Sequence, residues 1–194
     1  MTNPASGSLA PRIAKFNPCK DAIAWLGRRT LAQAWAECDR GDWMLWLAGR
    51  VDIDRRVLVR AAVECARLAL KYVKEGEDRP WYALEVALAW CDRRATLGQV
   101  HAAAYATYAA DAAYAPAAAY AADAAAYAAD AAADAAAYAA AAAATYAATY
   151  AATYADAADA ADAAAARAAS LCDSADTVRR LIPVELIEEA LNGK

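Results

Sequence analysis

A low-complexity run from Ala102 to Ala169 limits what this 194-residue chain can fold into. Most of the run is alanine, and nearly all of its other residues are Tyr, Asp or Thr. Alanine has the highest intrinsic helix propensity, and no Gly interrupts the run, so the sequence predicts helix. One straight helix over residues 117–169 would be about 80 Å long. A compact domain of this size has a radius of gyration of about 16 Å, too small for such a helix, so we favour several packed helices.

Within this tract, larger side chains recur every three or four residues and therefore share one stripe of a helix. The stripe residues are Tyr120, Asp123, Tyr127, Asp130, Asp134 and Tyr138. The alanine faces between them favour close helix packing, within the chain or between copies in a homo-oligomer. The stripe aspartates contribute to an acidic second half: residues 1–101 carry a net charge of about +4 and residues 102–194 about −8. This balance gives no large basic surface for nucleic acid.

The rest of the chain predicts an all-α fold, in which long or repeated alanine-rich helices pack against a helical-hairpin N-terminal core. A polar, proline-bearing start predicts a flexible arm, with Ile13 and Phe16 as its only anchors. The expected segments are the N-terminal arm (1–18), the helical core (19–95), the alanine-rich tract (96–170) and C-terminal short helices (171–194), with 19–194 as one domain.

One helix–turn–helix pattern occurs twice in the sequence. Ala22–Gln33 and Ala87–Gln99 each contain a helix ending in Arg-Arg and then Thr-x-x-Gln, the capping-box pattern that starts a second helix. Between them, Gly41 is typical of a left-handed helix end. Asp42 is expected to cap a short helix that Gly49 closes.

Three further expectations concern helix limits. Asp52 or Asp54 is expected to cap a central buried helix that continues to Val73. Pro80 favours the first position of the next helix. After the tract, Ala175–Ile182 and Pro183–Leu191 are predicted as two short helices.

The sequence offers no constellation that we interpret as catalytic, metal-binding or cofactor-binding. Its five cysteines form no CxxC pair, which argues against a zinc site or disulfide framework and fits a reducing cytoplasm. Cys38, Cys65 and Cys91, which recur about 26 residues apart in a Cys-x-Arg pattern, are interpreted as small core residues. The only histidine, His101, has no neighbouring nucleophile or orienting acid in sequence. No apolar stretch of the N-terminus resembles a signal peptide, and aspartates in the tract would be costly in lipid. We therefore expect a cytoplasmic protein that is not an enzyme, without membrane or nucleic-acid partners.

The most distinctive local segment is Cys38–Arg50, which contains two tryptophans three residues apart. Such tryptophans are most often core residues, but Trp and Arg are also enriched at interface hot spots. Trp43 and Trp46, with Arg40, Asp42 and Arg50, are therefore candidate partner-binding residues. The tract residues Tyr120, Asp123, Tyr127, Asp130 and Asp134 form a second candidate surface.

A family resemblance is carried by Leu31–Trp35, Cys38–Leu47, Ala61–Tyr72, the tract and the ending Val178–Pro183. Together these parts resemble a family of all-α immunity proteins that are associated with polymorphic toxins and are also encoded by phages. The likeness covers about residues 19–183. It implies a protein that binds and neutralises a toxin, and a basic toxin would suit the acidic stripe. The alternative is a structural or self-assembling scaffold, such as a phage accessory component. A more remote reading is ice binding through Thr145, Thr149 and Thr153, although bulky tyrosines flank each threonine.

Overall fold

The computed structural model describes residues 7–68, 70–72, 75–111 and 160–193. Every regular element in these ranges is helical, so the all-α prediction is confirmed. The helices are α1 (Leu9–Ile13), α2 (Lys20–Leu26), α3 (Leu31–Glu37), α4 (Gly41–Arg50), α5 (Arg55–Arg67), α6 (Arg79–Cys91), α7 (Leu97–Asp111), α10 (Ala160–Leu181) and α11 (Val184–Asn192), with 3₁₀ turns η2 (Ala14–Phe16) and η3 (Leu70–Tyr72).

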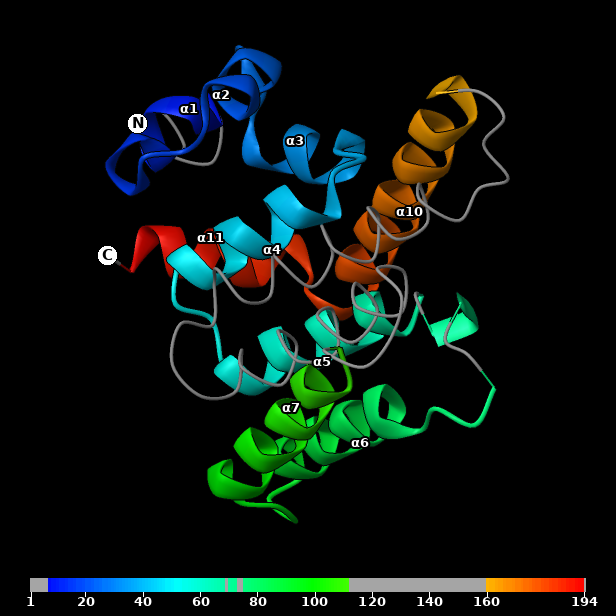
Figure 1. The fold of residues 1–194 in the computed structure, drawn as a ribbon. Helices are drawn as coiled ribbons and strands as arrows, with labels where there is room; N and C mark the ends of the chain where they lie inside the picture. The colour runs from blue at the N-terminus through cyan, green and yellow to red at the C-terminus, as the bar shows by residue number, and fades with distance from the viewer. Residues whose placement is uncertain (1–6, 69, 73–74, 112–159, 194) are drawn as a thin grey trace.

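The helices form a stack in which α10 packs against both α4 and α5 (Figure 1). Helix α6 packs on α5, and α7 lies beside α6 at one end of the stack. Helices α1, α2 and α3 gather at the other end, and α11 contacts α3. None of these described helices combines the length and apolar character that a membrane crossing needs.

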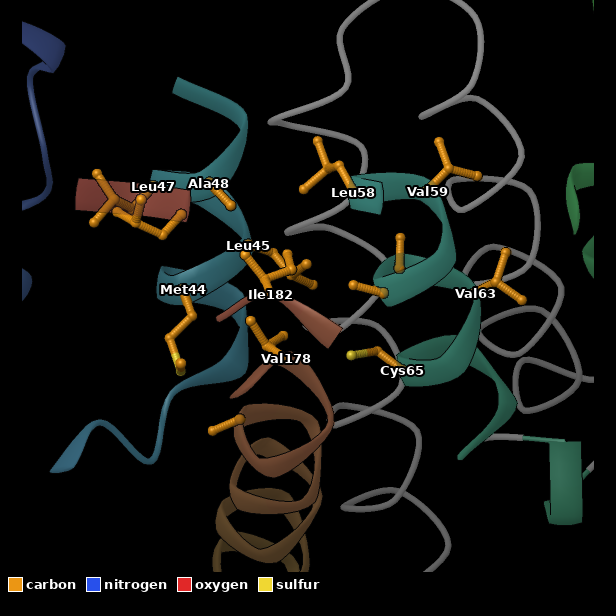
Figure 2. Close-up of a cluster of buried hydrophobic side chains, with 14 of the residues drawn as sticks. Met44, Leu45, Leu47, Ala48, Leu58, Val59, Val63, Cys65, Val178 and Ile182 are labelled. Carbon is orange, nitrogen blue, oxygen red and sulfur yellow. The ribbon is translucent and has the colours of Figure 1, made fainter. Parts of the chain in front are cut away.

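The hydrophobic core lies where α4, α5 and the end of α10 meet (Figure 2). Val178 and Ile182 point between the apolar side chains of α4 and those of α5. The most deeply buried members include Leu45, Leu58, Val59, Val63, Val178 and Ile182. Burying each such side chain contributes about 1.5–3 kcal/mol, so this cluster fixes α4 firmly against the rest of the molecule.

Helix α5 is the central buried helix that the sequence predicts. Seven of its residues are buried: Leu58, Val59, Ala61, Ala62, Val63, Cys65 and Ala66. Of the two proposed caps, Asp54 is the correct one, because its carboxylate accepts a hydrogen bond from the Arg56 N–H at 2.8 Å. The predicted end was wrong, since α5 stops at Arg67 and a separate 3₁₀ turn follows it.

Both predicted capping boxes are present. The Thr30 hydroxyl accepts from the Gln33 N–H and the Gln33 side chain accepts from the Thr30 N–H, and Thr96 and Gln99 make the same reciprocal pair. The two copies of the motif differ in packing, however. Helices α6 and α7 form a closely packed hairpin, whereas α2 and α3 have little contact with each other.

The prediction that Gly41 ends a helix in the left-handed conformation was wrong. Gly41 begins α4 and its φ is not positive; it lies instead against α10. A Cβ at Gly41 would lie 2.5 Å from the Ser174 Cβ and 2.7 Å from the Ala175 backbone nitrogen. Glycine is therefore required by the close approach of α4 and α10. Asp42 is not the cap either: Arg40 holds the N-cap position, and Gly49 lies inside α4.

Residues 8–18 do not form the flexible arm that we expected. They contain α1 and η2, and Leu9 and Ile13 are buried at 2% and 3% exposure. The Leu9 N–H donates to the Arg29 carbonyl at 2.8 Å, and Arg12 donates to Glu188 on α11. Of the two expected anchors, Ile13 is buried and Phe16 is half-buried. Proline content suggested an arm, but these tertiary contacts override it.

The first C-terminal helix is also longer than predicted. The expected Ala175–Ile182 segment is the last part of α10, which starts at Ala160. A buried stripe with helical spacing explains the extension: Ser170, Leu171, Ser174, Ala175, Thr177 and Val178. The break at Pro183 is as expected, and α11 follows it.

Candidate partner-binding surface

The candidate residues of the Cys38–Arg50 segment lie around α4, at the edge of the core. Helix α4 turns Met44, Leu45, Leu47 and Ala48 inward. Trp43 and Trp46 are half-buried and pack against the core from its margin, and Arg50 is exposed. The two tryptophans are therefore neither fully core nor fully surface.

Trp43 belongs to a group of two indoles that contact each other and are each covered by a guanidinium, which we call the Arg–Trp cluster: Trp25, Arg29, Arg40 and Trp43. The Arg40 guanidinium lies 4.4 Å from the Trp43 ring centroid, and that of Arg29 lies 4.6 Å from Trp25. The two indoles meet edge to face, with centroids 6.1 Å apart. These geometries are favourable for cation–π and aromatic pairs.

Acidic partners hold both arginines of the cluster in place. Arg40 donates to the two carboxylate oxygens of Asp42, at 2.9 and 2.6 Å. This hydrogen bond raises the pKa of Arg40 against the opposing effect of partial burial, so the guanidinium stays charged. Arg29 donates to Glu37 at 2.8 Å and to the Trp25 carbonyl. Each guanidinium of the cluster is therefore oriented by a carboxylate.

Trp46 and Arg50 form a separate and looser pair, with the guanidinium 5.8 Å from the ring centroid. The structure therefore joins Arg40, Asp42 and Trp43 closely and places Trp46 and Arg50 further along the same helix. The other predicted residues, Tyr120, Asp123, Tyr127, Asp130 and Asp134, lie outside the described residues, as do Thr145, Thr149 and Thr153.

Sequence reasoning missed Trp25 and Arg29 as members of this surface. Their spacing of four residues on one helix-and-turn segment could have indicated the stacking of arginine on tryptophan. It could not have indicated that Trp25 meets Trp43, because this contact depends on how α2 packs against α4.

Three cysteines lie at helix junctions as buried thiols, which agrees with their interpretation as small core residues. Each donates to a backbone carbonyl: Cys38 to Arg40, Cys65 to Ser174 and Cys91 to Arg56. Burial raises the pKa of Cys65 to about 12 and that of Cys91 to about 11. These thiols are protonated at neutral pH and therefore poor nucleophiles.

No group of three or more potential metal ligands gathers among the described residues. Asp42 belongs to α4 and half-buried His101 to α7, two helices that do not pack extensively against each other. What the Arg–Trp cluster can do is recognise planar, aromatic or carboxylate groups of a partner.

Comparison with known proteins gave no match to a family model, and neither a curated protein nor a solved structure was significantly similar to the chain.

Proposed function

We propose that this chain is a non-catalytic binding protein of bacterial or phage origin that neutralises a protein toxin in the cytosol. The observation that carries the proposal is the Arg–Trp cluster. It presents two half-buried indoles and two charged guanidiniums on one face of the molecule. Trp and Arg are the residues most enriched among those that dominate binding energy at protein interfaces.

The way the cluster is held strengthens this proposal. Helix α4 is anchored by fully buried Leu45 and Ala48 and by the contact of Gly41 with α10. Asp42 and Glu37 orient the two guanidiniums. A partner that docks here would lose little side-chain entropy in ordering these groups, and such preorganisation improves affinity.

The charge of the chain supports the choice of a basic partner. The sequence carries a net charge of −4. The excess acid lies in the second half of the chain, so a basic toxin would be attracted from a distance before it reaches the cluster. The resemblance to toxin-associated immunity proteins points to the same class of partner.

The test is to co-express the full chain with each product of the neighbouring genes and to score rescue of growth and co-purification. We expect one neighbour to be toxic, neutralised and bound. Trp43→Ala should weaken that binding by about 30-fold or more, which is typical of a hot-spot tryptophan. Trp43→Phe, which keeps an aromatic ring against the core, should have an intermediate effect.

Trp81 provides the matched control, because it is 54% exposed and lies on α6, away from the cluster. Trp81→Ala should bind and rescue like the parent protein. If no neighbour is bound, or if the Trp81 variant loses as much affinity as the Trp43 variant, the proposal is wrong.

A further inference from the structure

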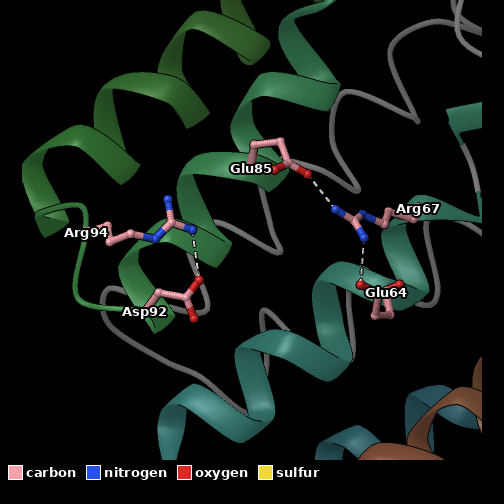
Figure 3. A network of polar contacts seen from close by, with 5 residues as sticks. All are labelled: Glu64, Arg67, Glu85, Asp92 and Arg94. Atoms are coloured by element: carbon pink, nitrogen blue, oxygen red, sulfur yellow. Dashed lines mark hydrogen bonds and ion pairs between the residues drawn. The ribbon is translucent and has the colours of Figure 1, made fainter.

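A second group of arginines lies where the first half of α5 passes the end of α6, at the other end of the helix stack from α1–α3. We call it the arginine patch: Arg56, Arg60, Arg93 and Arg94. Arg60 donates to one carboxylate oxygen of Asp92. Arg94 donates to the other at 2.8 Å, as Figure 3 shows. One carboxylate therefore serves two guanidiniums, which leaves an excess of positive charge.

The Asp92 carboxylate orients Arg60 and Arg94 but binds only part of their N–H donors. The side chains of Arg60 and Arg94 are 44% and 68% exposed. Each guanidinium has several N–H donors, of which Asp92 takes one from each. Hydrogen bonds from Arg94 and then Arg60 hold the pKa of Asp92 below its usual value, so this carboxylate remains charged. The remaining donors are available to an incoming acceptor.

Arg93 occupies a backbone position that normally favours glycine. Its φ is +61°, and its N–H and that of Arg94 donate to the Trp90 and Ala89 carbonyls, which is the Schellman pattern of a helix end. The turn after α2 has a glycine, Gly27, at its position of positive φ (+51°). The backbone alone closes α6, so helix termination does not require an arginine side chain here.

The side chain of Arg93 is exposed and makes no ion pair or hydrogen bond within the described residues. On α5, the Arg56 guanidinium lies 5.5 Å from the Trp90 ring centroid. The Arg56 Nε is buried without an acceptor among the described residues. The patch therefore combines charged donors with one indole face and keeps a strained residue that brings a further positive charge.

We propose that the arginine patch binds a short acidic segment of a protein partner, whose side-chain carboxylates meet Arg60, Arg93 and Arg94. Planar guanidinium groups match carboxylates in geometry as well as charge. The chain as a whole is negative, at −4, so an acidic ligand gains nothing from net charge and must bind locally. The patch is also interrupted by Asp92, which suits a short peptide better than a long phosphate backbone. This inference goes beyond the proposed function and concerns a different face.

The test uses the full chain and a fluorescein-labelled oligoglutamate peptide, with binding followed by fluorescence anisotropy at low salt. We expect saturable binding that weakens as salt is added. The double variant Arg93→Ala/Arg94→Ala should weaken it by about fivefold or more, as expected for the loss of two exposed charge contacts. Arg28→Ala, which removes an exposed arginine at the matching turn after α2, is the control and should bind the peptide as the parent does.

Arg93→Gly separates a binding role from a structural one. It relieves the left-handed strain, so we expect the melting temperature to rise by about 2–4 °C, while peptide affinity falls. Three outcomes would overturn the proposal: no binding of oligoglutamate, an equal loss in the Arg28 variant, or tighter binding of a single-stranded oligothymidylate than of oligoglutamate. The growth-rescue result for the Trp43 variants is independent of each of these outcomes.

Discussion

Among the described residues, arginine side chains cover tryptophan rings at four places. Guanidinium groups lie over Trp25, Trp43, Trp46 and Trp90 at 4.4–5.8 Å. Of the other two tryptophans, Trp81 is exposed, whereas Trp35 is buried and its indole N–H donates to the Ile182 carbonyl at 3.1 Å. A covered ring at the surface keeps its apolar face away from water yet remains available to a partner. Each exposed pair of this kind contributes about 0.5–1 kcal/mol.

Gly41 gives the sharpest test at the scale of a single residue. Gly41→Ala would force α4 away from the α10 backbone, because the added Cβ meets backbone atoms at 2.7 Å. We expect a loss of about 1–3 kcal/mol in unfolding free energy, as for other overpacked sites, measured by chemical denaturation.

Gly98 supplies the control for that measurement. It lies in the first turn of α7, and its nearest neighbour to an added Cβ, the Thr96 hydroxyl, is 3.9 Å away. Gly98→Ala should stabilise the protein by about 0.5–1 kcal/mol, since alanine loses less backbone entropy in a helix. Equal effects of the two substitutions would show that close helix packing is not what Gly41 provides.

Gly41 also shows what could not be predicted from the sequence. A glycine after Asp-Arg is typical of a helix end, and nothing nearby in the chain reveals Ser174 as its neighbour. Asp42 was similarly expected to cap a helix, yet it pairs with Arg40 at 2.6 Å. Trp43 and Arg40 could be selected as candidates from composition alone. Their contact with Trp25 and Arg29 could not be predicted, because it depends on how α2 packs against α4 in the tertiary structure.

At the scale of elements, local signals were sufficient for helix starts and insufficient for helix lengths. The Thr30 and Thr96 capping boxes involve residues three apart, so the sequence contains all the information that they need. The length of α10 depends on a stripe packed against α4 and α5, and α1 depends on contacts with the α2–α3 turn and α11. These lengths follow from packing partners far away in sequence.

The Thr96 cap can be tested directly. Thr96→Ala leaves the Gln99 N–H without its hydroxyl acceptor, which lies at 3.3 Å, and should cost about 1 kcal/mol. Thr96→Ser keeps the hydroxyl and should cost much less. Thermal unfolding followed by circular dichroism measures both, and a serine variant as unstable as the alanine variant would contradict the capping role.

At the scale of the whole molecule, the structure brings the two ends of the described chain together (Figure 1). Helices α1 and α11 meet through a bidentate ion pair, in which Arg12 donates to the two Glu188 oxygens at 3.2 and 3.0 Å. Arg12 also donates to the Asn192 side chain at 3.1 Å. Buried Leu9 on α1 and Ile187 on α11 are core members of the same two helices. The helix stack is thus closed by its first and last described elements.

This closure predicts a pH dependence of stability. The hydrogen bond from Arg12 lowers the pKa of Glu188 from its ordinary value of 4.5, with a smaller contribution from Asn192. Because the folded-state pKa is lower than the unfolded one, the ionised pair stabilises the fold above pH 4.5. That contribution disappears as the pH falls through the folded-state pKa. Glu188→Gln should therefore lower the free energy of unfolding by about 1 kcal/mol at neutral pH and by progressively less at acidic pH.

The neighbouring exposed residue gives the control: Glu189→Gln should change the free energy of unfolding little at any pH. A Glu188→Gln penalty that stayed constant from neutral to acidic pH in urea unfolding would mean that the pair does not close the molecule electrostatically.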